Sequence, residues 1–257
     1  MCYSAAYNSR KQVKYAQRYG ATPAEIEELK EQLNRLEVKY FASGFSHPNL
    51  PVITDEHPHA IQAYSWGLIP FWAKDASSAV KISTQCLNAR GETIFEKPAF
   101  RQSAKSKRCL ITCIDGFYEY YHLKGKTYPY FISLKSDEPI TFAGLWDRWE
   151  NKEEGLVRYT VTIVTTAANE VMARIHNNPK RENGESRMPL ILPQELEREW
   201  LKPFNDKVDK ELLQELIKPF PAELMQAHTV RQLSGKTGVG NTPEAQETYQ
   251  YEELKGL

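Results

Sequence analysis

The chain has 257 residues, of which 41% are hydrophobic and 26% are charged, a composition typical of a globular protein with one large domain or two small ones. Lys and Arg together number 33, as do Asp and Glu, so the net charge gives no indication of nucleic-acid binding and any basic surface must be local. Four cysteines do not make a disulfide framework, and no apolar run has the length of a membrane span or the features of a secretory signal, so a cytoplasmic location is expected.

The first predicted element is a helix over residues 23–39. Thr22 and Glu25 have the spacing of a capping box, and Pro23 suits the first helical turn. Apolar residues then recur at steps of three and four, as on one face of an amphipathic helix: Ile26, Leu29, Leu33 and Leu36. Residues 44–75 are punctuated by Pro and Gly, which predicts short strands and ordered loops.

Strand-forming residues dominate the middle of the chain. Apolar, aromatic and β-branched side chains predict strands over 108–120, 127–134, 139–149 and 156–168. The first of these is expected to end near Asp115-Gly116, and the last shows strong alternation. Helices are expected over 169–176, with Asn169 as its cap, and over 193–201 and 209–217, with a polar loop at 177–187. Because strands and helices alternate without a βαβ rhythm, an α+β fold in one domain is expected.

Cys2 follows Met1 directly, and this position points to a specific chemistry. Removal of Met1 would leave a cysteine with a free α-amine and a thiol on adjacent carbons. The amine can condense with an aldehyde to an imine, and the thiol can close onto that imine to give a thiazolidine. Both nucleophiles are accessible near neutral pH, because their ordinary pKa values are roughly 8 and about 8.5. A cysteine at this position is also compatible with an accident of sequence.

Three further features suit proton transfer or anion binding, and each also has an ordinary structural explanation. Glu119 lies among aromatic side chains, which raise the pKa of a carboxyl by desolvation, although an exposed Glu on an edge strand fits equally well. His176 ends the short predicted helix, where a lone histidine is more often structural. Residues 88–93 contain Asn88 and Arg90, and a turn with a salt-bridged arginine explains them equally well.

Two motifs are rejected as metal or phosphate sites. Cys109 and Cys113 are four residues apart, which places both thiols on one face of a strand, but no second pair completes a zinc site, so buried core thiols are favoured. The segment 234–240 (SGKTGVG) resembles a phosphate loop, yet position 230 is Val230 where that motif needs Gly. Neither a metal nor a cofactor is expected.

Cations concentrate between residues 81 and 108. The segment holds seven of them against Glu92 and Glu96: Lys81, Arg90, Lys97, Arg101, Lys105, Lys107 and Arg108. Three aromatic residues stand just upstream: Trp66, Phe71 and Trp72. Cations with stacking side chains are typical of single-stranded nucleic-acid binding, and a solvated basic loop is the alternative.

Taken together, the motifs resemble the SOS response-associated peptidase (SRAP) family. They run from residue 1 to about 192, with weaker similarity to about 230, and in order they are Met1-Cys2, WGLIPFW (66–72), NARGET (88–93), RCLITCIDGFYEY (108–120), AGLWD (143–147), His176 and RMPLIL (187–192). The resemblance implies an SRAP-like domain over 1–230, with mixed, mainly antiparallel sheets in a barrel-like core and peripheral helices. A C-terminal tail over 231–257 would follow it, and the Gly-, Thr- and Glu-rich composition of its last twenty residues predicts loose packing.

The resemblance also implies a function, that of a sensor and shield of abasic sites in single-stranded DNA. Cys2 would form a thiazolidine crosslink with the ring-opened sugar, and self-removal of Met1 would use the same groups. Catalytic roles are implied for Cys2, Asn88, Glu119 and His176, and DNA contacts for Arg90, Trp66, Phe71, Trp72, Arg101 and Lys105. A monomer is expected that needs no metal or cofactor, contacts no membrane and, in a bacterium, associates with the nucleoid.

This sequence departs from the family pattern in three places. Tyr3-Ser4 replaces the usual Gly-Arg, which removes one phosphate contact that Arg10, Lys11 or the basic segment 81–108 would have to replace. The motif that usually reads DGFYEW ends here in Tyr120 instead of Trp. Residues 177–186 form an inserted loop between His176 and the Arg-Met-Pro motif, which are normally almost adjacent. Two rival hypotheses stay open at this point: an N-terminal-cysteine hydrolase of peptides or amides, and a non-covalent nucleic-acid-binding module.

Overall fold

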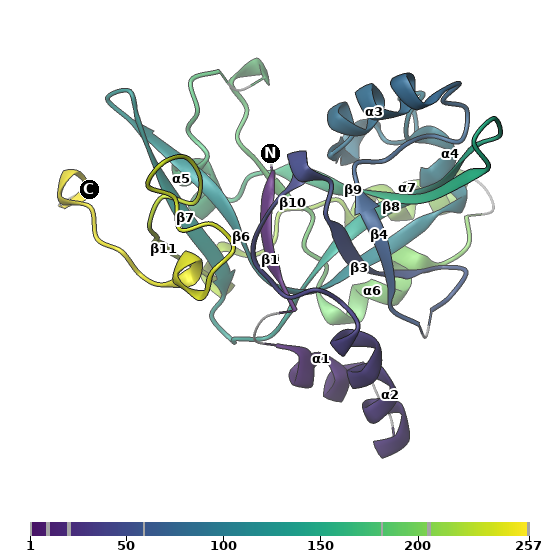
Figure 1. Cartoon of the computed structure of the whole chain (residues 1–257), viewed down its shortest axis with the longest axis horizontal. Coiled ribbons are helices and arrows are strands. Elements are labelled where there is room, and N and C mark those ends of the chain that lie inside the picture. The colour runs from purple at the N-terminus through teal and green to yellow at the C-terminus, as the bar shows by residue number, and fades with distance from the viewer. Residues whose placement is uncertain are drawn as a thin grey trace.

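A five-stranded barrel forms the centre of the molecule (Figure 1). The structure, a computed structural model, describes residues 2–8, 11–19, 22–58, 60–180, 182–204 and 207–255. The barrel strands are β3 (Asn49–Thr54), β4 (Gln62–Trp66), β9 (Leu156–Ala167), β8 (Ile140–Asn151) and β6 (Arg108–Leu123), each paired with the next and β6 with β3. The β4–β9 contact is parallel and the other four are antiparallel, so the expected α+β fold with a barrel-like, mainly antiparallel core is confirmed.

Two barrel strands extend beyond the ring and carry further strands. The second half of β6 pairs with β1 (Ser4–Tyr7) and β7 (Lys126–Leu134). β2 (Lys39–Ser43) then pairs with β1, and β11 (Met225–Thr229) with β7. The end of β9 carries β5 (Asn88–Arg90) on one edge and β10 (Arg187–Pro189) on the other, since Thr165 pairs with both. These extensions converge beside the chain start.

A bulge in β6 separates the barrel half of the strand from its extension. The expected end of this strand near Asp115-Gly116 is wrong, because pairing with β1 and β7 carries β6 on to Leu123. Cys113 has a left-handed backbone (φ 54°), and the pairing with β8 shifts register between Ile111 and Ile114. Cys109 and Cys113 therefore enter different core clusters, and the expectation that both thiols share one face is wrong, because a bulge adds a residue to the strand and breaks its alternation. Both thiols are fully buried, as expected for core cysteines.

Helix α2 (Pro23–Asn34) begins with the expected capping box. Glu25 N donates to Thr22 Oγ1 at 3.3 Å, and Thr22 N donates to Glu25 Oε2 at 2.9 Å. The helix ends at residue 34, five residues before the expected end at 39. Asn8 explains this end, because its Nδ2 donates to Leu33 O at 2.9 Å and to Leu36 O at 3.1 Å and so satisfies carbonyls that a longer helix would bond itself.

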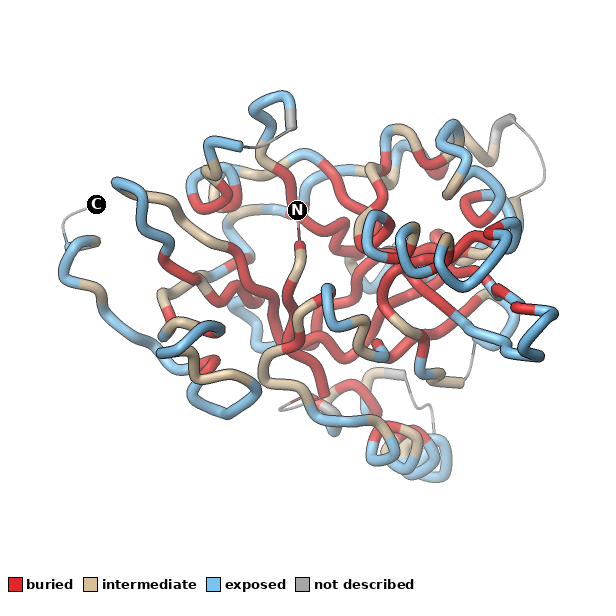
Figure 2. Tube along the Cα trace, turned by 45° about the horizontal axis from the view of Figure 1, so that its top comes forward, coloured by how far each residue is buried: buried red, intermediate tan, exposed pale blue. Residues whose placement is uncertain are grey.

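The other helices lie around the barrel (Figures 1 and 2). Three match expected helices: α5 (Glu170–Ile175), α6 (Gln194–Leu201) and α7 (Lys207–Leu216). Asn169 caps α5 as predicted, with its Oδ1 accepting from Met172 N at 3.0 Å. Three more were not foreseen: α1 (Gln12–Tyr19), α3 (Ala76–Gln85) and α4 (Arg101–Ser106). Of the helices that the structure describes, none is long and apolar enough to cross a membrane.

The chain after residue 230 packs onto the domain, whereas a loosely packed tail was expected. Leu233 and Ala245 are buried in a small core cluster with Tyr118 of β6 and Phe131 of β7. Asn241 Oδ1 accepts from the backbone N–H of Tyr40 at 2.8 Å, which covers the edge of β2. The phosphate-loop-like segment 234–240 is a bend and a turn followed by irregular chain, and no α-helix comes after it in the described residues, consistent with its rejection.

Candidate functional site

Cys2 lies where β1 begins, next to the second half of β6. Ser4 pairs with Tyr118, and the two strands are antiparallel. Cys2, two residues before Ser4, therefore lies alongside Glu119 and Tyr120 of β6. The Cys2 side chain is buried, with its Sγ 3.6 Å from Ser4 O. Met1, whose removal the expected chemistry requires, lies outside the described residues.

Asn88 binds the terminal cysteine directly. Its Nδ2 donates to Cys2 O at 2.8 Å, across 86 residues of sequence. β5 holds Asn88 in place, because Leu87 O just before it accepts from Ile163 N at 3.2 Å and from Trp66 Nε1 at 2.8 Å. Asn88 Oδ1 is buried and accepts no hydrogen bond from any described residue. An unsatisfied buried acceptor beside a candidate nucleophile is what a site awaiting a substrate donor would show.

Arg90 follows two residues later on the same strand and therefore on the same side. Its Nε is buried without a hydrogen-bond acceptor among the described residues, while its Nη2 donates to Glu185 on the inserted loop in an ion pair. The guanidinium expected to hold a DNA phosphate is thus half-buried and already faces one carboxylate.

Glu119 is the acidic group of the site. Its side chain is 8% exposed, and its Oε1 accepts from Tyr120 N at 3.1 Å. Burial raises the pKa of the Glu119 carboxyl above its ordinary value, because desolvation disfavours the charged form. Burial, and then the negative charge of Glu119, raises the pKa of the Cys2 thiol to about 12. The thiol therefore stays protonated at neutral pH and needs a base to react, and Glu119 is the carboxylate beside it.

His176 caps the C-terminal end of α5 in a fixed orientation. Its Nδ1 accepts from the backbone N–H of Arg187 at 2.9 Å. Because an N–H donates to Nδ1, a neutral ring carries its proton on Nε2, which leaves Nε2–H as the donor. Ser186 Oγ also donates to His176 O at 2.8 Å.

The segment after His176 is tied to β6. Asn177 Oδ1 accepts from His122 N at 2.6 Å and its Nδ2 donates to His122 O at 2.9 Å, so one side chain pairs with the strand as a backbone would. Helix α5 packs on β6, and Ile175 shares a core cluster with Cys2. The structure thus brings Cys2, Asn88, Glu119 and the element carrying His176 to one place.

The aromatic residues after β4 have different positions. Trp66 is fully buried in the core, and its indole N–H donates to Leu87 O. The expected contact of Trp66 with DNA bases is therefore wrong for this structure. The ring instead supports the segment that carries Asn88. Phe71 and Trp72 are 56% and 45% exposed, and both rings are accessible on the surface. An exposed aromatic that the sequence did not single out, Phe45, stacks on Tyr3.

The basic segment 81–108 does not form one surface. Arg108 is buried, with its Nε donating to Trp200 O at 2.7 Å, and Lys107 pairs with Asp147 at 2.5 Å. Arg101 and Lys105 are exposed on α4, next to the start of β6 at Arg108. Glu119 lies eleven residues further along β6, near its other end. These two cations remain candidate DNA contacts, away from Cys2.

The proposed replacements for the missing family arginine also differ. Lys11 is buried, and its Nζ donates to Asp115 O at 3.2 Å and to Glu138 O at 3.0 Å, so it is a structural residue rather than a phosphate ligand. Arg10 lies outside the described residues.

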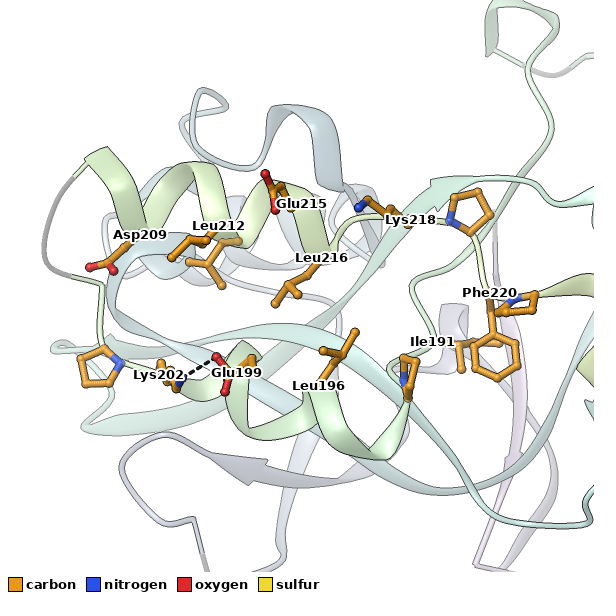
Figure 3. A pocket seen from close by; sticks show the side chains of 15 residues that line it. Ile191, Leu196, Glu199, Lys202, Asp209, Leu212, Glu215, Leu216, Lys218 and Phe220 are labelled. Atoms are coloured by element: carbon orange, nitrogen blue, oxygen red, sulfur yellow. Dashed lines mark hydrogen bonds and ion pairs between the residues drawn. The ribbon is translucent and has the colours of Figure 1, made fainter.

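A groove elsewhere on the molecule is separate from this site. It lies between α6 and α7, with a volume of about 540 Å³, and Leu196, Leu212 and Leu216 face one another across it (Figure 3). None of the site residues expected from the sequence lines this groove. The candidate site is therefore the polar cluster at the chain start.

Comparison with known proteins identifies the family of the chain. Residues 1–237 match the family model described as SOS response associated peptidase (SRAP), and the chain belongs to this family. It is 39% identical to the abasic site processing protein YoqW of Bacillus subtilis (strain 168), over 88% of this chain and 96% of YoqW. It is 30% identical to the abasic site processing protein HMCES of Xenopus tropicalis, over 74% of this chain and 58% of that longer protein.

A solved structure from Bacteroides thetaiotaomicron superposes on nearly the whole chain. Its TM-score is 0.80 at 33% identity, with 97% of this chain and 100% of that one covered. A second, from Bordetella bronchiseptica, has a TM-score of 0.69 at 24% identity and shows the same fold.

Proposed function

We propose that this protein processes abasic sites in single-stranded DNA by covalent capture through Cys2. The observation that carries the proposal is the placement of Cys2, which is buried at the start of the chain with Asn88 bonded to its carbonyl and Glu119 beside it. The names of YoqW and HMCES, abasic site processing proteins, support the substrate.

The chemistry begins after hydrolysis removes Met1. The Cys2 amine adds to the aldehyde carbon of the ring-opened sugar, and the resulting carbinolamine loses water to give an imine. The Cys2 sulfur then bonds to the imine carbon while the thiol proton passes to nitrogen, which closes a thiazolidine. No oxidant or reductant is consumed, and the only catalytic help that each step requires is proton transfer.

The neighbouring residues supply those transfers. Burial raises the pKa of the Glu119 carboxyl above its ordinary value, and Glu119 exchanges protons with the amine and the thiol. His176 offers Nε2–H to the sugar ring oxygen during ring opening. Asn88 Oδ1 and Arg90 Nε are buried and have no hydrogen-bond partner among the described residues, so Asn88 can accept from the sugar and Arg90 can donate to its phosphate. Phe71, Trp72, Arg101 and Lys105 would contact DNA further away.

The same groups suit removal of Met1 by attack of Cys2 on its own preceding peptide bond. All of these side chains come from one chain, so we propose that the protein acts as a monomer. Peptidase or lyase activity toward other molecules would require release of product from Cys2, and the rival of an N-terminal-cysteine hydrolase makes that prediction.

The test is incubation of the purified protein with a single-stranded oligonucleotide that carries one abasic site, followed by denaturing electrophoresis. A slowly migrating band that requires the lesion is expected from wild type and is expected to disappear in Cys2→Ser, because serine cannot form a thiazolidine. Intact-mass measurement of the same sample reports whether Met1 is absent. A heat-stable band of wild-type intensity from Cys2→Ser would contradict the proposal.

Glu119→Gln provides the pH test. Gln has similar size but cannot exchange a proton, so the crosslinking rate should fall by about 10²-fold or more. Because burial raises the Glu119 pKa, wild type should show a pH–rate transition above the ordinary range of a carboxyl, and the variant should lack it. Equal rates and equal pH profiles would remove Glu119 from the mechanism. Amide turnover without DNA crosslinking by protein lacking Met1 would favour the hydrolase.

A further inference from the structure

We infer that Phe45 is a stacking platform for the nucleobase next to the abasic sugar. This inference rests on the proposed function and adds a residue and a ligand class to it. Phe45 lies in the short 3₁₀ turn η1 (Gly44–Ser46) that joins β2 to β3, and η1 lies beside the chain start (Figure 1).

Phe45 is joined to the reaction centre through Tyr3. The two rings stack with centroids 5.2 Å apart and planes at 28°, and Gly44 N donates to Tyr3 O at 2.8 Å. Tyr3 is the residue directly after Cys2, so an object stacked on Phe45 is held a short distance from the nucleophile. The Phe45 side chain is nevertheless 58% exposed, the highest value among the large hydrophobic residues that the structure describes as exposed.

The turn that carries Phe45 is held firmly from behind. A Cβ at Gly44 would lie 3.2 Å from the buried ring of Trp66, so the turn sits directly on that ring. His47 ends the turn with a left-handed backbone (φ 50°), and its Nδ1 bonds Trp66 O at 2.7 Å. Trp66, which does not reach the surface, thus supports the aromatic residue that does. A rigid aromatic ring binds with a small loss of conformational entropy.

A base is the ligand that fits this ring. At an abasic position the neighbouring bases lose a stacking partner, and an aromatic side chain can replace it for any base, because every base has a flat π-face. The chain also replaces the usual Gly-Arg of the family with Tyr3-Ser4. The missing cation would bind phosphate, whereas Tyr3 supports a ring, so this chain exchanges an electrostatic contact for a stacking contact beside Cys2.

The experiment measures stacking without the covalent step. Single-stranded oligonucleotides carry a tetrahydrofuran abasic analogue, which has no aldehyde, with 2-aminopurine placed immediately 5′ or 3′ of it. Stacking quenches 2-aminopurine fluorescence. Binding to wild type is expected to quench one of the two probes, and Phe45→Leu, which keeps an apolar side chain but removes the flat ring, is expected to abolish that quenching and weaken binding about five-fold or more. Phe45→Trp should restore both.

Tyr159→Leu is the matched control. Tyr159 is 44% exposed and stacks on Tyr64 with centroids 5.2 Å apart, in a geometry like that of the Phe45–Tyr3 pair, but on β9 in the barrel. The Tyr159→Leu variant should quench 2-aminopurine fluorescence as wild type does. Thermal melting of each variant checks folding. Unchanged quenching and affinity in folded Phe45→Leu, or equal losses in Tyr159→Leu, would overturn the inference.

The crosslinking assay separates this result from the proposed function. If wild type crosslinks a true abasic site and Phe45→Leu shows unchanged quenching, the capture chemistry stands and the stacking platform is wrong. If wild type lacking Met1 forms no crosslink and quenches neither probe, the proposed function itself fails.

Discussion

Arg90 shows how one inserted residue can affect the expected DNA contact. Its guanidinium pairs with Glu185, which belongs to the loop 177–186 that separates the histidine and Arg-Met-Pro motifs. A carboxylate and a phosphate compete for the same donors of an arginine. Under the proposed function, DNA that uses Arg90 must displace Glu185, so we expect Glu185 to weaken non-covalent binding.

Replacing Glu185 should strengthen DNA binding. Glu185→Gln removes the competing charge, and because both partners are partly exposed, we expect a modest increase of about two- to five-fold in affinity for single-stranded DNA. Fluorescence anisotropy at fixed salt measures this. Glu154→Gln, an exposed glutamate in the β8–β9 turn, is the control for net charge. Weaker binding of Glu185→Gln alone would instead mean that Glu185 orients Arg90.

At the residue scale, the chemical role of a site residue could be predicted more reliably than the solvent exposure of an aromatic side chain. The terminal cysteine, the asparagine and the glutamate are marked by motifs, and the structure brings them together at the chain start. Trp66 could not be placed correctly, because an aromatic residue near a glycine suits a core and a surface equally well. Phe45 lies in a turn with no periodic pattern, and its contact with Tyr3 depends on the pairing of β1 with β2, which no local signal specifies.

Among the elements, the segment after α5 decides how firmly His176 is held. Asn177 fastens that segment to β6 through two hydrogen bonds, and the backbone of Arg187 fixes the imidazole from the other side. The inserted loop thus begins and ends at fixed points. Its length can vary between them without moving the histidine, which explains how a longer loop is compatible with the same site.

Removing the Asn177 side chain should loosen this arrangement. Asn177→Ala deletes both bonds to His122, so His176 samples more orientations and the crosslinking rate should fall about ten-fold, with non-covalent DNA affinity little changed. Single-turnover kinetics and anisotropy on the same protein separate the two quantities. Asn177→Asp keeps one acceptor for His122 N and should retain part of the rate. An equal loss of affinity and rate would indicate a general collapse of the loop.

The elements that could be predicted are those with a strong local signal. β9 alternates clearly, and α2 has a complete capping box. The helices α1, α3 and α4 were missed although their lengths match those of the predicted α5, α6 and α7, because the stability of helices this short comes mostly from packing in the folded protein rather than from the local sequence. The bulge at Cys113 was also missed, since it arises where β6 leaves the barrel and depends on strands distant in sequence.

At the scale of the whole molecule, the chain after residue 230 belongs to the fold. It buries Leu233 and Ala245 and provides the acceptor for the N–H of Tyr40 on β2. β2 leads directly into the turn that carries Phe45. The last part of the sequence therefore supports the same sheet that positions Cys2.

Truncation after residue 230 should destabilise the protein. Loss of this segment exposes Tyr118 and Phe131 and leaves the edge of β2 uncovered, so we expect a fall of several degrees or more in Tm and a tendency to associate through the open edge. Differential scanning calorimetry and light scattering measure these effects. Asn241→Ala, which removes only the acceptor at β2, should lower Tm by less. A truncated protein that melts as wild type does would show a dispensable tail.

The position of Cys2 has one more consequence, for the life of a newly made chain. The first strand lies between β2 and β6, so its pairing is incomplete until β6, near the middle of the sequence, has been synthesised. A terminal aminothiol reacts with any aldehyde it meets, including small metabolites. In the finished fold the cysteine is 1% exposed and its thiol is held in the protonated form. Under the proposed chemistry, folding therefore protects the reactive groups of Cys2 from small carbonyl compounds and reserves them for an abasic sugar bound in the site.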